Sequence, residues 1–246
     1  MKRRTVLLGG AGLAGAAALA GLGAMTFRLH ATPRRAPDLT AAHLATLRDL
    51  PRAPGPRVLF VGNSMTLRHD LAARIGARAQ AEGAAPQIAV AAARGARLIE
   101  TQRIAAFRAV LESGWDILVL QDFSTVSLRA PDRWGSAFAM QAMAKVAQPR
   151  AVVLFPTWAF PPRHRVYSRG AGALSRPPAD PGTFAQAIIA HYEGVARSHG
   201  WHRAPVTEAF LPDATPWLEE DLHHPNPAGT ARLADVLWQS LARTLA

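Results

Sequence analysis

The sequence of 246 residues contains no cysteine. This absence excludes disulfide bonds, thiolate metal sites, a cysteine nucleophile and a lipid-modified N-terminal cysteine. It leaves the compartment open, because a protein without disulfides can still be exported.

Lysine is nearly absent as well. Only Lys2 and Lys145 are lysines among the 28 basic residues, and the formal net charge is +11. A GC-rich genome explains this arginine bias as well as function does. No five consecutive residues are basic and no nucleic-acid recognition module is present, so we predict no nucleic-acid partner. With 49% apolar and 18% charged residues, the chain is expected to be globular.

The first 31 residues are predicted to be an export signal or a membrane anchor. Arg3-Arg4 is followed by Thr5 and a long run of Ala, Gly and Leu, which resembles a twin-arginine signal. The run approaches the roughly 20 residues that span a bilayer, so a retained segment would associate the N-terminus with the membrane. We therefore expect an exported protein, periplasmic or extracellular. Mass spectrometry of the exported form tests whether residues 1–31 remain.

Glycines in the same segment do not indicate a cofactor. Gly10 to Gly15 fits G-x-G-x-x-G, but a dinucleotide site also needs a helix, a second strand and an acid about 20 residues further on. Here the small residues simply continue. The sequence therefore predicts no cofactor.

The rest of the chain is predicted to consist of a linker with a short helix at 32–55 and one globular domain at 56–246. Short apolar runs predict strands at 57–61, 87–91, 116–121, 151–155 and, faintly, 204–207, with helices expected at 39–50, 67–82, 97–113, 133–147, 183–198 and 228–245. This alternation predicts an α/β fold: a three-layer, flavodoxin-like sandwich of about five parallel strands with helices on both faces. Active sites in such sheets lie at the carboxyl ends of the strands.

A serine lies at the end of the first predicted strand, in PRVLFVGNSMT, where Ser64 follows Gly62-Asn63. Such a serine can cap a helix or act as a nucleophile. Before the last predicted helix, Asp221 and His224 are three residues apart, so one turn can place the carboxylate beside the imidazole. A solvated turn is the plain alternative for this segment. A metal site is disfavoured because adjacent histidines rarely face one ion and no third strong ligand is evident.

Taken together, these motifs resemble those of the SGNH/GDSL hydrolases, from about residue 57 to the C-terminus. Gly62-Asn63-Ser64, a glycine after the second strand, and Asp-x-x-His-Pro before the last helix carry the resemblance. It implies an esterase that needs no metal, with Ser64 as nucleophile, His224 as general base and Asp221 as its orienting partner. It also implies that the backbone amides of Ser64 and Gly95 form the oxyanion hole.

One feature departs from the family pattern. The family commonly supplies an asparagine side chain to the oxyanion hole, but no asparagine lies between Asn63 and Asn226. Gln121, at the end of the third strand, is our candidate for this donor; Ser124 and Thr125 are alternatives. We expect Asp122 to anchor the loop through backbone amides, since an ionised carboxylate would repel an oxyanion. Trp158 and Asn63 are expected at the cleft wall.

The resemblance and the export signal favour a small-molecule or glycan ester as substrate, with a short acyl group such as acetyl. A lysophospholipase, a thioesterase and a non-catalytic glycan-binding module are the alternatives. The loop at 161–182 is rich in Arg, Pro and Gly, so it is either a cleft rim or a solvated loop without a role.

Overall fold

The computed structural model describes residues 38–169 and 176–245. Their centre is a five-stranded parallel sheet with the strand order β2-β1-β3-β4-β5. The strands are β1 (Arg57–Gly62), β2 (Gln87–Ala92), β3 (Ile117–Leu120), β4 (Ala151–Leu154) and β5 (His202–Arg203). This order confirms the predicted three-layer α/β fold. Strands β2 and β3 lie on opposite sides of β1, so the order in which strands are added to the sheet reverses after β2.

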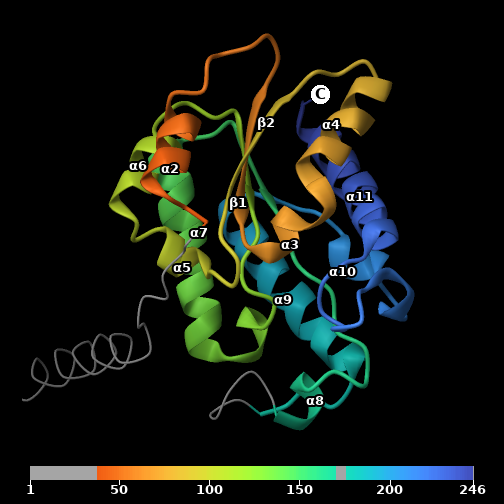
Figure 1. The fold of residues 1–246 in the computed structure, drawn as a ribbon. Helices are drawn as coiled ribbons and strands as arrows, with labels where there is room; N and C mark the ends of the chain where they lie inside the picture. Colours follow the sequence, from red (N-terminus) through yellow and green to blue (C-terminus); the bar gives the residue numbers. More distant parts are fainter. Residues whose placement is uncertain (1–37, 170–175, 246) are drawn as a thin grey trace, which may run out of the picture. The chain divides into compact units, whose positions relative to one another are not determined.

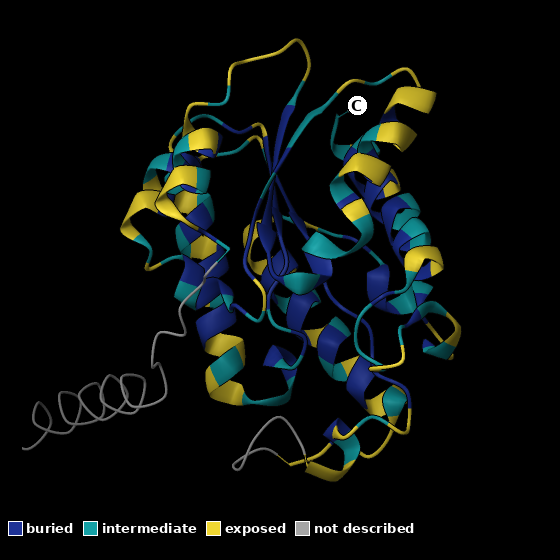
Figure 2. Cartoon of the chain, viewed as in Figure 1, coloured by how far each residue is buried: buried dark blue, intermediate teal, exposed yellow. Residues whose placement is uncertain are grey.

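The sheet is held by apolar residues on both faces. Every residue of β1 and β3 is buried, because helices cover the sheet on either side (Figure 2). Helices α4 (Leu71–Ala81) and α11 (Pro227–Leu245) pack together on one side of the sheet (Figure 1). On the other side lie α2 (Ala41–Arg48), α5 (Leu98–Thr101), α6 (Ala105–Leu111) and α7 (Ala130–Ala147).

The remaining helical segments connect these elements. They are α3 (Ser64–Leu67), α8 (Val166–Arg169), α9 (Pro181–His199), α10 (Val206–Ala209) and the 3-10 turns η1 (Arg68–Asp70), η2 (Val126–Leu128) and η3 (Thr215–Trp217). Helix α9 shows how local sequence sets such bounds. The Asp180 side chain accepts a hydrogen bond from the Thr183 amide at 2.7 Å, and Gly200 ends the helix with a φ of +67°.

The fifth strand lies earlier in the chain than predicted. It occupies residues 202–203 and not 204–207, and the latter segment turns into α10. The Ala204 amide still donates to the Leu154 carbonyl at 2.9 Å, but Pro205 has no amide hydrogen to continue the ladder. This edge strand is also partly exposed, so its sequence lacks the apolar run that marks the inner strands.

Two predicted helices are interrupted. The helix expected at 67–82 begins only at Leu71, after the short α3 and a turn in which His69 and Asp70 have left-handed φ values of 47° and 55°. The helix expected at 97–113 is split into α5 and α6, because Ile104 between them has an extended backbone with ψ 110°.

The predicted boundary at residue 55 lies inside the folded unit. Helix α2 contacts α6 and β2 and buries Leu44 and Leu47, so this part of the expected linker belongs to the same compact unit as the sheet. The export signal predicted for residues 1–31 falls outside the described residues. Within residues 38–169 and 176–245, none of the helices is long and apolar enough to cross a membrane.

Candidate active site

Ser64 is the first residue of α3, directly after the buried strand β1. Asn63 precedes it as the helix cap, and its side-chain oxygen accepts a hydrogen bond from the Met65 amide at 3.2 Å. The capping role is thus taken by Asn63, which leaves the Ser64 hydroxyl available for another partner. The cap role that the sequence allowed for Ser64 is therefore filled by its neighbour, and the Ser64 hydroxyl is free for the second role, that of a nucleophile.

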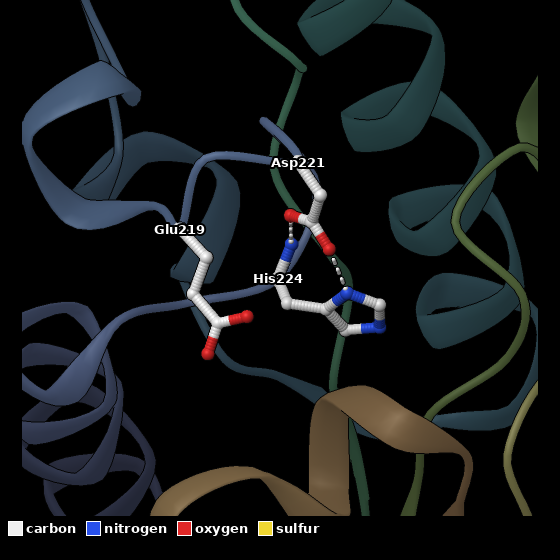
Figure 3. A group of neighbouring side chains, drawn as sticks. All are labelled: Glu219, Asp221 and His224. Atoms are coloured by element: carbon white, nitrogen blue, oxygen red, sulfur yellow. Dashed lines mark hydrogen bonds and ion pairs between the residues drawn. The ribbon is translucent and has the colours of Figure 1, made fainter.

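The structure brings the three predicted catalytic side chains together. The Ser64 Oγ lies 2.9 Å from His224 Nε2, and His224 Nδ1 lies 2.6 Å from Asp221 Oδ2. In Figure 3 the imidazole directs one nitrogen to the carboxylate and the other away from it. Ser64, His224 and Asp221 therefore form a continuous hydrogen-bonded chain of the kind that a serine hydrolase requires.

The loop that carries Asp221 also fixes its charge. Partial burial raises the pKa of the carboxyl, but hydrogen bonds from the His224 ring and from the His224 and His223 amides outweigh this effect and lower it to about 2. Asp221 is therefore ionised throughout the physiological pH range. An ionised Asp221 keeps the proton of His224 on Nδ1 and leaves Nε2 free to accept the serine proton.

The Ser64–His224 contact opens into a cleft of about 390 Å³. Its lining residues are Ser64, Leu67, Arg68, Arg94, Gly95, Phe123, His223 and His224. Gly95 adopts a φ of +69° that glycine favours, and it approaches the cleft from the loop after β2. In the described part of the chain, the backbone amides of Ser64 and Gly95 have no hydrogen-bond acceptor. Both predicted amides are thus available as oxyanion donors at the cleft.

Gln121, the predicted third oxyanion donor, does not lie at the cleft. Its side chain is buried and does not line the cleft. The side-chain oxygen accepts from the Asn63 amide at 2.9 Å and from the Thr66 hydroxyl at 3.1 Å, while the side-chain nitrogen donates to the Asp122 carbonyl. Gln121 therefore connects the end of β3 to the turn that carries Ser64, and in this conformation its donor is directed at the backbone.

Asp122 anchors the neighbouring loop, as expected. Its Oδ1 accepts from the amides of Leu98 at 2.9 Å and of Phe123 at 2.7 Å. Burial raises the pKa of this carboxyl, although these hydrogen bonds oppose the shift. Leu98 begins α5, just after the Gly95 loop, so Asp122 ties that loop to the end of β3.

The two residues expected at the cleft wall are both core residues. Trp158 is fully buried and stacks on Phe210, with ring centroids 4.4 Å apart. Asn63 is also buried; besides capping α3 it donates to the Ala96 carbonyl at 3.2 Å. Both residues come soon after the end of a strand, but their side chains are buried in the interior and do not line the cleft.

Glu219 is a site residue that sequence reasoning missed. Its carboxylate accepts from Arg68 at 3.2 Å and lies 2.9 Å from His69 Nε2. Glu219, Asp221 and His224 are close enough for a shared metal ion, with ligand atoms within 4.8 Å of one another. Figure 3 shows Glu219 beside the pair without a bond to either side chain. A metal here would have to displace the hydrogen bonds that align Asp221, His224 and Ser64.

His223, the neighbour of His224, also lines the cleft. The pKa of His223 is lowered to about 4, mainly by burial and to a smaller extent by the neighbouring His224 and His164. The ring is therefore neutral near pH 7. It packs 4.7 Å from Phe160 and 4.7 Å from His224, centroid to centroid, so it supports the catalytic imidazole from the side.

No family model and no curated protein matches the chain, but solved structures do. A protein of Slackia heliotrinireducens assigned to the SGNH hydrolases has a TM-score of 0.63 and 24% identity over 76% of this chain and 99% of its own. A family 3 carbohydrate esterase of Clostridium thermocellum has a TM-score of 0.59 and 11% identity, covering 78% of this chain and 97% of its own.

The psychrotrophic esterase EstA of Pseudoalteromonas sp. is also similar, with a TM-score of 0.56 and 13% identity over 76% of this chain and 97% of its own. At these identities the likeness concerns the fold. It agrees with the strand order, with the resemblance in the sequence motifs and with the position of Ser64 after β1. The chain has the fold of the SGNH hydrolases.

Proposed function

We propose that this protein is a serine hydrolase that cleaves ester bonds through an acyl-enzyme. The observation that carries the proposal is the chain of contacts from Ser64 Oγ to His224 Nε2, at 2.9 Å, and from His224 Nδ1 to Asp221, at 2.6 Å. This chain of contacts opens into a cleft, beside the backbone amides of Ser64 and Gly95, which have no acceptor in the described part of the chain. SGNH hydrolases and esterases among the similar structures support the same reaction class.

The geometry supplies each step of acyl transfer. His224 takes the proton of Ser64 as the serine oxygen attacks the ester carbonyl, and ionised Asp221 stabilises the resulting imidazolium. The amides of Ser64 and Gly95 stabilise the developing oxyanion; one such donor is typically worth on the order of 10²- to 10³-fold in rate. His224 then gives its proton to the departing alcohol. Water activated by the same histidine hydrolyses the acyl-enzyme and restores the serine.

The substrate that we propose is a short-chain, acetyl-like ester of a carbohydrate or envelope glycan. The cleft of about 390 Å³ is small and half open, with Leu67 and Phe123 as its apolar side chains, which suits a short acyl group better than a long one. Similar structures include a carbohydrate esterase and a two-domain esterase active on acetylated mannans. A thioesterase or lysophospholipase would need an extended apolar groove for its acyl chain.

The proposal is tested with p-nitrophenyl acetate and a fluorophosphonate probe. The wild-type protein should hydrolyse the ester, and the probe should label Ser64 alone. Ser64→Ala should lower the rate to near background, on the order of 10⁴-fold or more, while thermal unfolding stays unchanged because the hydroxyl is only half-buried.

The competing function is a non-catalytic glycan-binding module that keeps the fold. It is favoured by the missing asparagine and opposed by the intact hydrogen-bonded triad. A wild-type protein without esterase activity and without probe labelling would support this module and overturn the hydrolase.

A further inference from the structure

Two arginines line the catalytic cleft, and none of the acidic residues that the structure describes does. Arg68 follows α3, and Arg94 belongs to the loop after β2, so they approach the cleft from different segments. The other lining residues are apolar, small, a serine or histidines. Among the described residues, Arg68 and Arg94 are therefore the only side chains of the lining with a permanent charge.

Each arginine is held by a carboxylate that does not itself line the cleft. Arg94 Nη1 lies 2.8 Å from Asp38 Oδ1, and the Arg94 amide donates to the same carboxylate at 2.7 Å. Arg68 Nη1 lies 3.2 Å from Glu219. Such pairs restrict the long side chains before a ligand arrives, which lowers the entropy that binding has to overcome.

Both guanidinium groups keep donors for a ligand. Each uses only Nη1 in its ion pair, and in the described part of the chain Nε and Nη2 of Arg68 and Arg94 have no acceptor. A planar guanidinium with a free pair of N–H groups matches the two oxygens of a carboxylate or phosphate. Both arginines line the same cleft as Ser64, so a substrate bound at the serine lies beside these donors.

We propose that Arg68 and Arg94 form a subsite for an anionic group, a carboxylate or a phosphate, on the alcohol part of the ester. This inference rests on the proposed function and narrows its substrate class to acylated acidic compounds. The ring of His223 is neutral, so the described lining residues offer the anion no other permanent cationic partner.

The test compares three acetyl esters of similar shape: 4-acetoxybenzoate, 4-acetoxyphenyl phosphate and neutral 4-acetoxybenzamide. For each, kcat/KM is divided by the rate of hydroxide hydrolysis, which removes the intrinsic reactivity of the leaving group. We expect at least one anionic ester to exceed the amide by about tenfold, the size of a charge-assisted interaction at a half-open site. The two anionic arms distinguish a carboxylate from a phosphate.

The variants are Arg94→Gln, Arg68→Gln and, as a matched control, Arg108→Gln. Arg108 is as exposed as Arg94, 69% against 72%, and also lies 2.8 Å from a carboxylate, but it does not line the cleft. The anionic-to-neutral ratio should fall about fivefold or more in the cleft variants and stay unchanged in Arg108→Gln. High salt should lower the wild-type ratio, because it screens the charges.

Equal ratios for wild type and all three variants would overturn the subsite. Binding of the same compounds to Ser64→Ala, measured by calorimetry, separates this inference from the proposed reaction. If the anionic esters bind more tightly than the amide and Arg94→Gln removes the difference, the subsite stands even where wild type hydrolyses nothing. If all three are hydrolysed with equal ratios and bind equally, the esterase stands and the subsite fails.

Discussion

Asp221 remains charged because three hydrogen bonds converge on its carboxylate, from the His224 ring and from two backbone amides. The two amides belong to His223 and His224 in the same turn, so the turn itself keeps the carboxylate ionised before any substrate binds. This explains why a spacing of three residues can serve catalysis: the loop that presents His224 also presents the acceptors that hold its ring.

At the same scale, Gln121 has a role that only its side-chain contacts reveal. Its amide oxygen holds the turn of Ser64 through the Asn63 amide and the Thr66 hydroxyl, and its nitrogen is bonded to the Asp122 carbonyl. A residue in an oxyanion hole would instead keep its donor free at the cleft. The structure therefore changes our expectation for Gln121 from a substrate contact to a support of the nucleophile.

This change leads to a prediction for Gln121→Ala. The variant leaves the buried Asn63 amide without an acceptor, so the free energy of unfolding should fall by about 2 kcal/mol, together with a loss in kcat. Denaturant unfolding and steady-state kinetics measure the two effects. Ser124→Ala removes the alternative donor and should leave kcat unchanged, because Ser124 does not line the cleft. A loss of about 10²-fold in kcat with unchanged unfolding would restore Gln121 as a transition-state donor.

At the scale of elements, the active site joins two segments that are distant in sequence. The segment of α3 and η1 carries Ser64, and the loop before α11 carries His224. Glu219 contacts both: its carboxylate holds Arg68 and His69, and its amide donates to the His224 carbonyl at 2.8 Å. His69 and the next residue have left-handed backbones, which cost about 1 kcal/mol or more each for non-glycine residues. We infer from these contacts that Glu219 positions the two segments relative to each other.

We predict that Glu219→Ala lowers kcat by about tenfold or more with little change in KM for p-nitrophenyl acetate, because Ser64 and His224 lose their alignment. Fluorophosphonate labelling of Ser64 should slow by a similar factor. Glu219→Gln should restore part of the rate, since its oxygen still accepts from His69 and Arg68. The exposed neighbour Glu220 is the control, and Glu220→Ala should behave as wild type. Equal rates for Glu219→Ala and Glu220→Ala would exclude the positioning role.

The strand ends were predictable at this scale because buried parallel strands leave apolar runs. Ser64 and Gly95 were located in this way, at the ends of β1 and β2. The edge strand β5 was misplaced, since a partly exposed pair of residues carries no such run. Glu219 and the orientation of Trp158 depend on contacts between distant segments, for which no local pattern exists in the sequence.

At the scale of the whole molecule, burial keeps two of the described histidines neutral: His191, which is buried, and His223, which is half-buried. Burial and, to a smaller extent, the charge of Arg133 lower the pKa of His191 to about 4. Its Nε2 has no hydrogen-bond partner within the described residues. His223 is lowered to about the same value. In the unfolded chain both should titrate near the usual value of about 6.5.

These shifts predict how stability depends on pH. Below about pH 6.5 the two histidines are protonated in the unfolded chain, whereas in the folded protein they stay neutral down to about pH 4. The free energy of unfolding should therefore fall as the pH falls through this window. Each histidine should contribute a loss of about 2 kcal/mol between pH 7 and 4.5. Asp221 acts outside this window: with a pKa lowered to about 2, it stabilises the fold above about pH 4 and loses that effect only in stronger acid.

His191→Gln isolates this effect, because His191 belongs to α9, lines a pocket between α7 and α9, and does not line the catalytic cleft. Urea unfolding at pH 7 and at pH 4.5 should show a smaller loss of stability for the variant than for wild type, by about 2 kcal/mol. The exposed His202 supplies the control, and His202→Gln should keep the wild-type pH dependence. If His191→Gln loses as much stability between these pH values as wild type does, His191 titrates alike in both states, and the acid sensitivity of the fold has another source.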